Sequence, residues 1–297
     1  MFNRILFPTD GSDGAAVALD HLLDFATRHN ATIHILNVAN TTPVSVPQMQ
    51  ENEVDALVQE GERLVSEAAN QARRRGIDTV TEVLQGKPYR KIVGYAETNG
   101  LDLVVMPTHG RRGLERFLLG STTERVVRRA DVPVLTIHPD ADGTITYPHQ
   151  DILVPTDGSD CANQALALGV DLIDTEGAAL HLLSVIAVAA LGVNIRTDIQ
   201  MDLLEQSAHE LLDEAATVAE NAGVEQTSKT VEYGASIHKA ILAYIDKHDI
   251  DLVVVGTHGR TGFDRYVLGS VTEYLIRTSP IPVLTVPAPD PDTEEIH

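Results

Sequence analysis

The stretch Ile5-Leu6-Phe7-Pro8-Thr9-Asp10-Gly11-Ser12-Asp13 recurs 147 residues later as Ile152-Leu153-Val154-Pro155-Thr156-Asp157-Gly158-Ser159-Asp160. Each copy is an apolar run of strand length that leads through a glycine turn into a stretch with helical periodicity. A match of this length at so long a period indicates a tandem repeat of whole domains. The sequence therefore predicts two similar domains, which a chain of 297 residues can accommodate at about 150 residues each.

Further segments recur along the chain. Residues 33–38 match 180–185, residues 102–111 match 251–260, and residues 132–137 match 281–286. The last two pairs are offset by 149 residues instead of 147, so the second copy has two extra residues between positions 185 and 251. We expect domains at 1–138 and 151–287, a polar linker over 139–150, and an acidic disordered tail over 288–297.

Within each copy, apolar runs alternate with helical stretches, which is typical of βαβ units and a parallel sheet. In the first copy we expect strands near residues 4–8, 32–38, 79–84, 102–107 and 133–137. A long helix is expected over 53–75, ended by Gly76, and its twin over 201–221, ended by Gly223. Because the strands are nearly continuous in Val, Ile and Leu, helices should cover both faces of a doubly wound sheet.

The composition excludes several classes of protein. A net charge of −21 opposes binding to DNA or RNA, and no apolar run reaches the roughly 20 residues of a membrane span. Residues 1–8 resemble a strand rather than a secretory signal, which predicts a cytoplasmic protein. The single cysteine, Cys161, excludes an intramolecular disulfide, and no Cys/His spacing predicts a metal site.

The charge is unevenly distributed. Residues 1–147 hold 15 basic and 19 acidic residues, whereas residues 148–297 hold 7 and 24. Only five of the 22 basic residues are lysines. Excess carboxylate with scarce lysine is typical of halophilic proteins and favours a haloarchaeal source. An acidic mesophilic protein kept soluble by its charge is the alternative.

Doubly wound sheets bind ligands beyond the carboxyl ends of the strands, where the strand order reverses. After strand one, Asp10 and Asp157 stand at that edge, and Ser12 and Ser159 open the following helices. Asp and Ser are also common helix caps. For both residue types, a capping role and a ligand role therefore stay open.

The loop after strand four carries a more specific signal. Gly256-Thr257-His258-Gly259 is followed by nine residues and Gly269-Ser270, so two glycine turns flank a segment able to fold over a ligand. Glycines let backbone N–H groups approach phosphate oxygens, and a helix N-terminus favours anions. Ser270-Val271-Thr272-Glu273 and Ser121-Thr122-Thr123-Glu124 also fit a capping box. We favour phosphate binding over a purely structural turn.

Two histidines, His109 and His258, lie inside these loops. Neither has a carboxylate partner at fixed spacing. We therefore expect them to shape the loops by hydrogen bonding rather than to act as catalytic bases.

This glycine spacing after a Val-rich strand is similar to the ATP loop of the universal stress proteins, and the resemblance covers nearly all of both copies. It implies two adenine nucleotide alpha hydrolase-like domains, each a doubly wound sheet of five strands in the order 3-2-1-4-5. It also implies pairing of the two domains through their last strands and ATP with Mg²⁺ at the carboxyl edge of each sheet. Whether two chains associate further into a homodimer stays open.

By this resemblance Asp157 contacts the ribose, Val185 the adenine, and the glycine loop the phosphates. The binding residues implied in the second copy are Pro155, Thr156, Asp157, Val185, Gly256, Thr257, His258, Gly259, Arg260, Thr261, Gly262, Gly269, Ser270 and Val271. Those implied in the first copy are Pro8, Thr9, Asp10, Val38, Thr108, His109, Gly110, Arg111, Gly120, Ser121 and Thr122.

The first copy departs from the pattern at Pro107, which stands where Gly256 opens the loop of the second copy. Proline has no N–H and adds a ring where glycine leaves space. We therefore predict that the second copy binds ATP more tightly than the first.

Three functions compete. The leading hypothesis is a regulatory ATP-binding protein of the stress response. The second is a slow ATPase or related enzyme, which the sequence favours less because strand one is followed by neither a Walker loop nor G-x-G-x-x-G, and no residue stands out as a base. The third is an interaction module without nucleotide, against which the intact glycine motif of the second copy argues.

Overall fold

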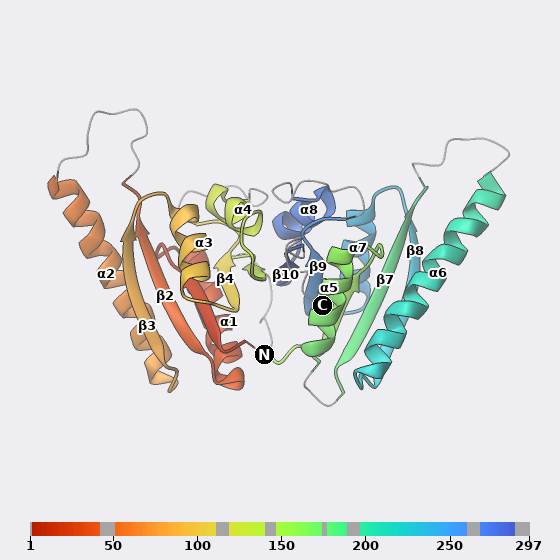
Figure 1. Ribbon diagram of the computed structural model, residues 1–297, viewed down its shortest axis with the longest axis horizontal. Coiled ribbons are helices and arrows are strands. Elements are labelled where there is room, and N and C mark those ends of the chain that lie inside the picture. Colours follow the sequence, from red (N-terminus) through yellow and green to blue (C-terminus); the bar gives the residue numbers. More distant parts are fainter. Residues whose placement is uncertain are drawn as a thin grey trace, which may run out of the picture. The chain divides into compact units, whose positions relative to one another are not determined.

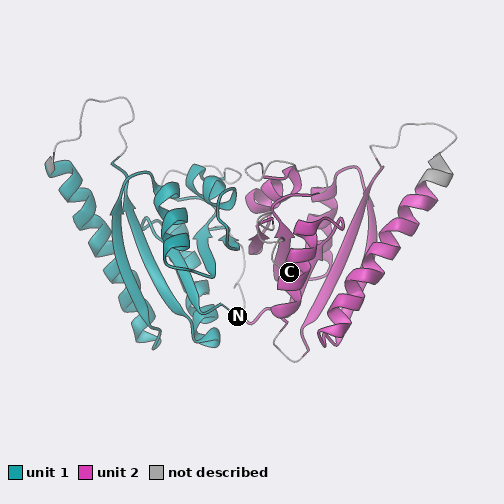
Figure 2. Cartoon of the chain, viewed as in Figure 1, with its two compact units in different colours: residues 1–147 teal, residues 148–297 magenta. Residues whose placement is uncertain are grey.

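The computed structural model describes residues 2–41, 51–110, 119–139, 147–173, 177–188, 197–259 and 268–288. The chain forms two compact units, unit 1 (Met1–Tyr147) and unit 2 (Pro148–His297), coloured separately in Figure 2. Most of the expected linker and nearly all of the expected acidic tail, residues 140–146 and 289–297, lie outside the described residues.

Each unit alternates strands with helices, as predicted (Figure 1). Unit 1 contains β1 (Arg4–Pro8), α1 (Asp13–His29), β2 (Thr32–Ala39), α2 (Glu51–Arg74), β3 (Thr79–Gln85), α3 (Pro88–Thr98), β4 (Leu103–Pro107), α4 (Ser121–Val127) and β5 (Val134–Ile137). Unit 2 contains β6 (Asp151–Pro155), α5 (Asp160–Asp171), β7 (Ala179–Ala187), α6 (Thr197–Asn221), β8 (Gln226–Gly234), α7 (Ile237–Lys247), β9 (Leu252–Gly256), α8 (Ser270–Thr278) and β10 (Val283–Val286).

The strand order confirms the doubly wound fold. In unit 1 the described strands run in the order β3-β2-β1-β4-β5, and every neighbouring pair is parallel. Unit 2 repeats the arrangement with β8-β7-β6-β9-β10. The register is also repeated, since Ile5 lies opposite Ile33 and Leu103 just as Ile152 lies opposite Leu180 and Leu252.

The central strands form the core because helices cover both of their faces. Ile5, Leu6 and Phe7 of β1 are buried, as are Ile152, Leu153 and Val154 of β6. Right-handed crossovers place α1 and α2 on one face of the sheet and α3 and α4 on the other. Among the described residues, no helix is both long and apolar enough to cross a membrane.

A repeated aspartate fixes the amino-terminal edge of each sheet. Asp102 accepts hydrogen bonds from the backbone N–H groups of Asn3 and Arg4, both at 2.9 Å. Asp251 does the same for Gln150 at 2.6 Å and Asp151 at 3.3 Å. These contacts hold the first and fourth strands of each unit together, so that their opposite, carboxyl ends lie side by side.

Candidate functional site

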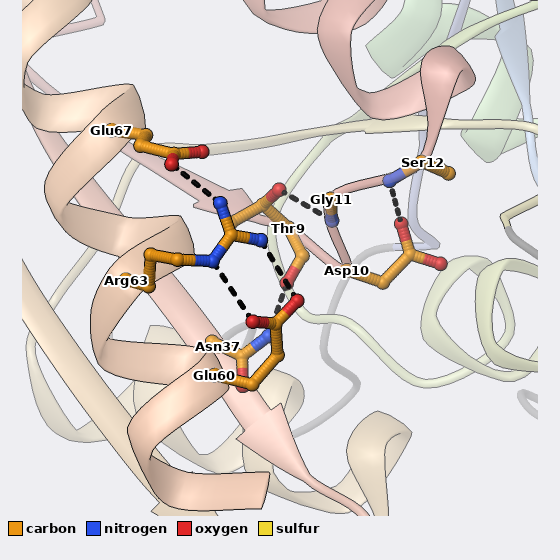
Figure 3. A network of polar contacts seen from close by, with 8 residues as sticks. All are labelled: Thr9, Asp10, Gly11, Ser12, Asn37, Glu60, Arg63 and Glu67. Carbon is orange, nitrogen blue, oxygen red and sulfur yellow. Dashed lines mark hydrogen bonds and ion pairs between the residues drawn. The ribbon is translucent and has the colours of Figure 1, made fainter.

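The turn after β1 is built from Thr9, Asp10, Gly11 and Ser12 (Figure 3). Gly11 N–H donates to Thr9 Oγ1 at 3.2 Å, and Ser12 N–H donates to Asp10 Oδ1 at 3.0 Å. Gly11 has φ +72°, a left-handed conformation that favours glycine. Ser12 is the N-cap of α1, since its Oγ accepts from Ala15 N–H at 3.2 Å.

Unit 2 repeats this turn. Gly158 N–H donates to Thr156 Oγ1 at 3.2 Å, and Ser159 N–H donates to Asp157 Oδ1 at 3.0 Å. Ser159 caps α5 by accepting from Ala162 N–H at 3.3 Å. The serine thus has a capping role in both units, and Oδ1 of the aspartate accepts from the serine N–H at the sheet edge.

A backbone hydrogen bond closes the loop after the fourth strand. Gly120 N–H donates to Thr108 O at 2.8 Å, and Gly269 N–H donates to Thr257 O at 2.8 Å. A Cβ on Gly120 would lie 3.1 Å from Thr108 O, and one on Gly269 would lie 3.2 Å from Thr257 O. These glycines therefore let the two ends of the loop approach each other.

The capping box, the structural alternative at these loops, is not formed. The N-cap of α4 is Gly120 and that of α8 is Gly269, and neither helix has a side-chain cap hydrogen bond. Ser121 and Ser270 are instead the first residues of these helices. The close approach to the carbonyl at the strand end favours glycine at the cap position, and the first N–H groups of each helix are left without a side-chain cap.

The second glycine of the loop leaves room for the aspartate of the first turn. A Cβ on Gly110 would lie 2.1 Å from Asp10 Oδ2, and one on Gly259 would lie 2.7 Å from Asp157 Oδ2. The structure thus brings together the strand-one aspartate and the strand-four glycine, two sequence-predicted site residues about 100 positions apart.

The loop histidines are held by their own neighbours. His109 Nδ1 lies 3.2 Å from Thr108 Oγ1, and His258 Nδ1 lies 2.9 Å from Thr257 Oγ1. All four side chains are buried. The His109 ring also meets His138 edge-on at 5.5 Å, whereas His258 Nε2 is buried without a hydrogen-bond partner among the described residues. The hydrogen bonds to threonine are of the loop-shaping kind that the sequence predicted.

A cavity of about 550 Å³ opens at this edge of unit 1. The sequence-predicted residues that line it are Pro8, Thr9, Asp10, Val38, His109, Gly110, Gly120, Ser121 and Thr122. Thr108 is buried beside it and is bonded to His109. Arg111, Arg260, Thr261 and Gly262 lie outside the described residues.

The second unit presents the same arrangement of its predicted residues. Pro155, Thr156 and Asp157 form the end of β6 and its turn, and Val185 lies near the end of β7. Gly256, Thr257, His258 and Gly259 follow along β9 and its loop, while Gly269, Ser270 and Val271 begin α8.

Sequence reasoning missed much of the cavity wall. The additional lining residues include Asn37, Leu57, Glu60, Gly61, Leu64, Pro88, Ile92, Met106 and Leu119. Asn37 Nδ2 donates to Thr9 O at 2.8 Å and so supports the turn after β1 (Figure 3). Arg63 donates two hydrogen bonds of 2.9 Å to the carboxylate of Glu60. A polar residue in the apolar run of residues 33–38 was the available signal for Asn37.

Gly61 could also have been recognised, because glycine inside a helix usually has a packing reason. A Cβ at Gly61 would lie 2.5 Å from Asn37 Oδ1. The matching positions of unit 2, 147 residues later, hold the smaller Ser184 and the larger Ala208, both buried. The residues at this pair of positions therefore differ between the two units.

The Pro107 position shows the same kind of exchange. A Cβ on Gly256 would lie 2.7 Å from Cys161 Sγ and 2.9 Å from Cys161 O, so α5 occupies the space beside this glycine. In unit 1 the residue that matches Cys161 is Gly14, and a Cβ there would lie 3.3 Å from Pro107 Cβ. The space beside Gly256 is therefore filled by Cys161, and the ring of Pro107 is accommodated by Gly14.

Comparison with known proteins agrees with this architecture. The model of the universal stress protein family matches residues 1–138 and again 148–287. Universal stress protein Rv2005c of Mycobacterium tuberculosis is 29% identical over 291 residues, which is 94% of this chain and 95% of that protein. Universal stress protein MJ0531 of Methanocaldococcus jannaschii is 36% identical over 140 residues, which is 46% of this chain and 82% of that protein.

A solved structure extends the likeness to the whole chain. The crystal structure of a universal stress protein from Archaeoglobus fulgidus covers 97% of each chain with a TM-score of 0.75 and 25% sequence identity. The repeat, the strand order and the glycine loops thus all point the same way. The chain belongs to the universal stress protein family and carries two of its domains in tandem.

Proposed function

We propose that this protein is a regulatory, cytoplasmic protein of the stress response that binds ATP at the carboxyl edge of the first and fourth strands of each unit. The cavity of about 550 Å³ in unit 1 carries the proposal, because its volume falls within the range of about 300–1,000 Å³ for small-ligand sites. One part of its wall is polar, with Asp10, Gly110 and Ser121. Another part is apolar, with Leu57 and Ile92, as a nucleotide with a charged tail and a flat base requires.

The chain's own groups suit each part of such a ligand. The phosphates would meet the first N–H groups of α4, which carry the partial positive charge of a helix N-terminus. Oδ2 of the strand-one aspartate would accept from the ribose hydroxyls, while its Oδ1 stays bonded to Ser12 N–H. Val38 would meet the adenine through its backbone, against the apolar wall of α2 and α3.

The donor set also fits Mg²⁺ delivered with the nucleotide. Mg²⁺ prefers oxygen ligands and is usually held by phosphates, water and one or two carboxylates. Asp10 offers a carboxylate, and Ser121 and Thr122 offer hydroxyls, all on the cavity wall. In the part of the chain that the structure describes, no group of three or more His, Cys, Asp or Glu side chains could hold a metal ion alone. The ion would therefore depend on the nucleotide.

We propose that the two sites are unequal, with unit 2 the tighter one. Gly256 has a backbone N–H and Pro107 has none. The N–H groups of Val253 and Thr257, on either side of Gly256 along the chain, donate to the carbonyls of Pro282, just before β10, and Val286, its last residue. One missing hydrogen bond costs about 1 kcal/mol, or roughly fivefold in affinity. Since Gly14 makes room for the proline, unit 1 should be weaker rather than inactive.

The experiment is calorimetric titration of ATP with Mg²⁺ into the full chain and into Ser270→Pro. Proline is tolerated at the first helical position and removes only an N–H donor, while Ser270→Ala keeps that N–H and is the matched control. We expect Ser270→Pro to weaken the tighter binding event by about tenfold or more and Ser121→Pro to weaken the other one similarly, because each lost N–H would have bonded a charged phosphate. Titrations without any heat, together with an unchanged melting temperature in millimolar ATP, would exclude nucleotide binding.

Regulation and hydrolysis are separated by a second measurement. Phosphate release from bound ATP should be slow compared with ordinary ATPase turnover, since Nδ1 of each loop histidine is directed to a threonine hydroxyl and not to an orienting carboxylate. Release at about 1 s⁻¹ or faster would assign an enzyme instead.

A further inference from the structure

Basic side chains gather on two neighbouring helices of unit 1. They form what we call the basic patch: Lys87, Arg90 and Lys91 at the start of α3, and Arg125, Arg128 and Arg129 on and just after α4. All except the half-buried Arg128 are exposed. Figure 1 shows the two helices packed beside each other. This concentration of positive charge stands on a chain whose net charge is −21.

Tyr89 organises the patch. The guanidinium carbons of Arg125, Arg129 and Arg90 lie 5.2, 5.4 and 5.9 Å from the centre of its ring, within the range of cation–π attraction. Arg90 Nε also donates to the Tyr89 hydroxyl at 3.1 Å. That hydrogen bond and the charge of the surrounding cations lower the pKa of Tyr89. The arginines are thus held in place around one ring before any partner arrives.

Unit 2 lacks this arrangement at the matching positions. The residues of unit 2 that lie 149 positions after the patch residues Lys87, Arg90, Lys91, Arg125, Arg128 and Arg129 are, in that order, Ser236, Lys239, Ala240, Tyr274, Arg277 and Thr278. His238 replaces the tyrosine and stacks on Tyr274 at 3.8 Å. Since the fold of the two units is the same, the fold does not require the cations.

The nucleotide cavity does not account for the patch either. The cavity is lined by other residues of the same helices, namely Pro88 and Ile92 of α3 and Ser121, Thr122 and Thr123 of α4. Within the patch, Glu124 pairs with Arg128 at 2.8 Å. On the described stretches that carry the patch, residues 87–98 and 121–131, the other acidic residues are Glu97 near the end of α3 and Asp131 after α4.

We propose that the basic patch of unit 1 binds an acidic, Asp/Glu-rich segment of a partner protein. Charge complementarity selects an acidic partner, and guanidinium groups match carboxylates with paired hydrogen bonds. The eleven residues of α3 span only about 16 Å, which suits a short segment. A long nucleic acid would extend beyond the patch onto the rest of unit 1, which holds 19 acidic and nine basic residues, and would be repelled there.

The test uses the full chain and a fluorescein-labelled peptide of ten glutamates, followed by fluorescence anisotropy at low ionic strength. We expect saturable binding that the triple variant Arg90→Gln/Arg125→Gln/Arg129→Gln weakens by about tenfold or more, since each exposed ion pair contributes a factor of about two to five. The control Arg28→Gln/Arg73→Gln/Arg74→Gln removes the same charge from exposed positions of α1 and α2 and should change affinity less than twofold.

A second variant guards against misfolding. Lys87→Gln/Lys91→Gln leaves the Tyr89 cluster untouched and should still weaken binding by severalfold. Equal affinity in the patch and control variants would overturn the proposal, as would the absence of binding by the unaltered chain. Tighter, patch-dependent binding of a ten-nucleotide oligothymidylate than of the peptide would also overturn it, and would assign the patch to nucleic acid.

Discussion

Gly110→Ala tests whether the strand-four glycine exists to accommodate the strand-one aspartate. The new methyl group would lie 2.1 Å from Asp10 Oδ2 and 3.1 Å from its Cγ. The carboxylate must therefore rotate away and lose its 3.0 Å hydrogen bond from Ser12 N–H. The lost bond costs about 1 kcal/mol and the displaced rotamer about 1 kcal/mol more, so unit 1 should be destabilised by about 2 kcal/mol.

A double-mutant cycle isolates this contact. With Asp10→Ala in place, the methyl group of Gly110→Ala meets no carboxylate, and its cost should fall close to zero. The coupling energy should therefore be about 2 kcal/mol. Urea denaturation followed by hydrogen exchange and mass spectrometry measures it without nucleotide, because peptides of the β1–α1 turn report on unit 1 separately from unit 2.

The control is Gly94→Ala on α3, where an added Cβ has no atom within 4 Å. This substitution should stabilise the helix by about 0.5–1 kcal/mol, as alanine does in a helix interior. If Gly110→Ala costs the same with and without the Asp10 carboxylate, the glycine has another purpose and the geometric argument fails.

Three further predictions test the local structure. Ser12→Ala should lower the free energy of unfolding by about 1 kcal/mol because it removes the N-cap of α1. Ser121→Ala should be nearly neutral because Gly120 is the N-cap of α4. Comparable losses for the two variants in urea denaturation would indicate that Ser121 caps α4 after all. Burial lowers the pKa of His34, so the unfolded state binds the extra proton and stability should fall as pH drops below about 6.5. His34→Gln should reduce that slope, and an unchanged slope would contradict the assignment. Gly256→Ala should cost about 1–3 kcal/mol by overpacking against Cys161, and Cys161→Ala should relieve it only in part because the backbone of residue 161 stays at 2.9 Å; a neutral Gly256→Ala in the same assay would refute this packing.

The sequence predicted the fold well because the fold depends on patterns that are local and repeated. Apolar runs placed the strands of unit 1 to within one residue at either end, and α2 was expected at 53–75 and lies at Glu51–Arg74. The edge of the sheet that holds the cavity followed from topology alone. Such features need no knowledge of which side chains meet across the core.

What the sequence could not give are contacts between distant positions. The capping box is not formed because the N-cap of α4 falls on Gly120 instead of Ser121. Gly120 lies close to Thr108 O, a backbone atom twelve residues away. The cavity wall from α2 and α3 was missed because only the folded chain brings Leu57 and Ile92 to the end of β1. In each case the deciding distance is between elements, and no periodicity along the chain records it.

The loop glycines are therefore best understood one by one. Gly120 closes the loop, Gly110 admits the Asp10 carboxylate, and Gly256 packs against Cys161. Only the last contact differs between the units. Unit 2 packs the small Gly256 against the larger Cys161, whereas unit 1 packs the larger Pro107 against the small Gly14. The proline that stands in place of the first loop glycine in unit 1 is thus accommodated by Gly14 on α1. The two glycines that shape the cavity, Gly110 and Gly120, are kept. It follows that a missing first glycine does not by itself disqualify a site, and that any difference in affinity between the units should be limited to the one N–H that proline cannot supply.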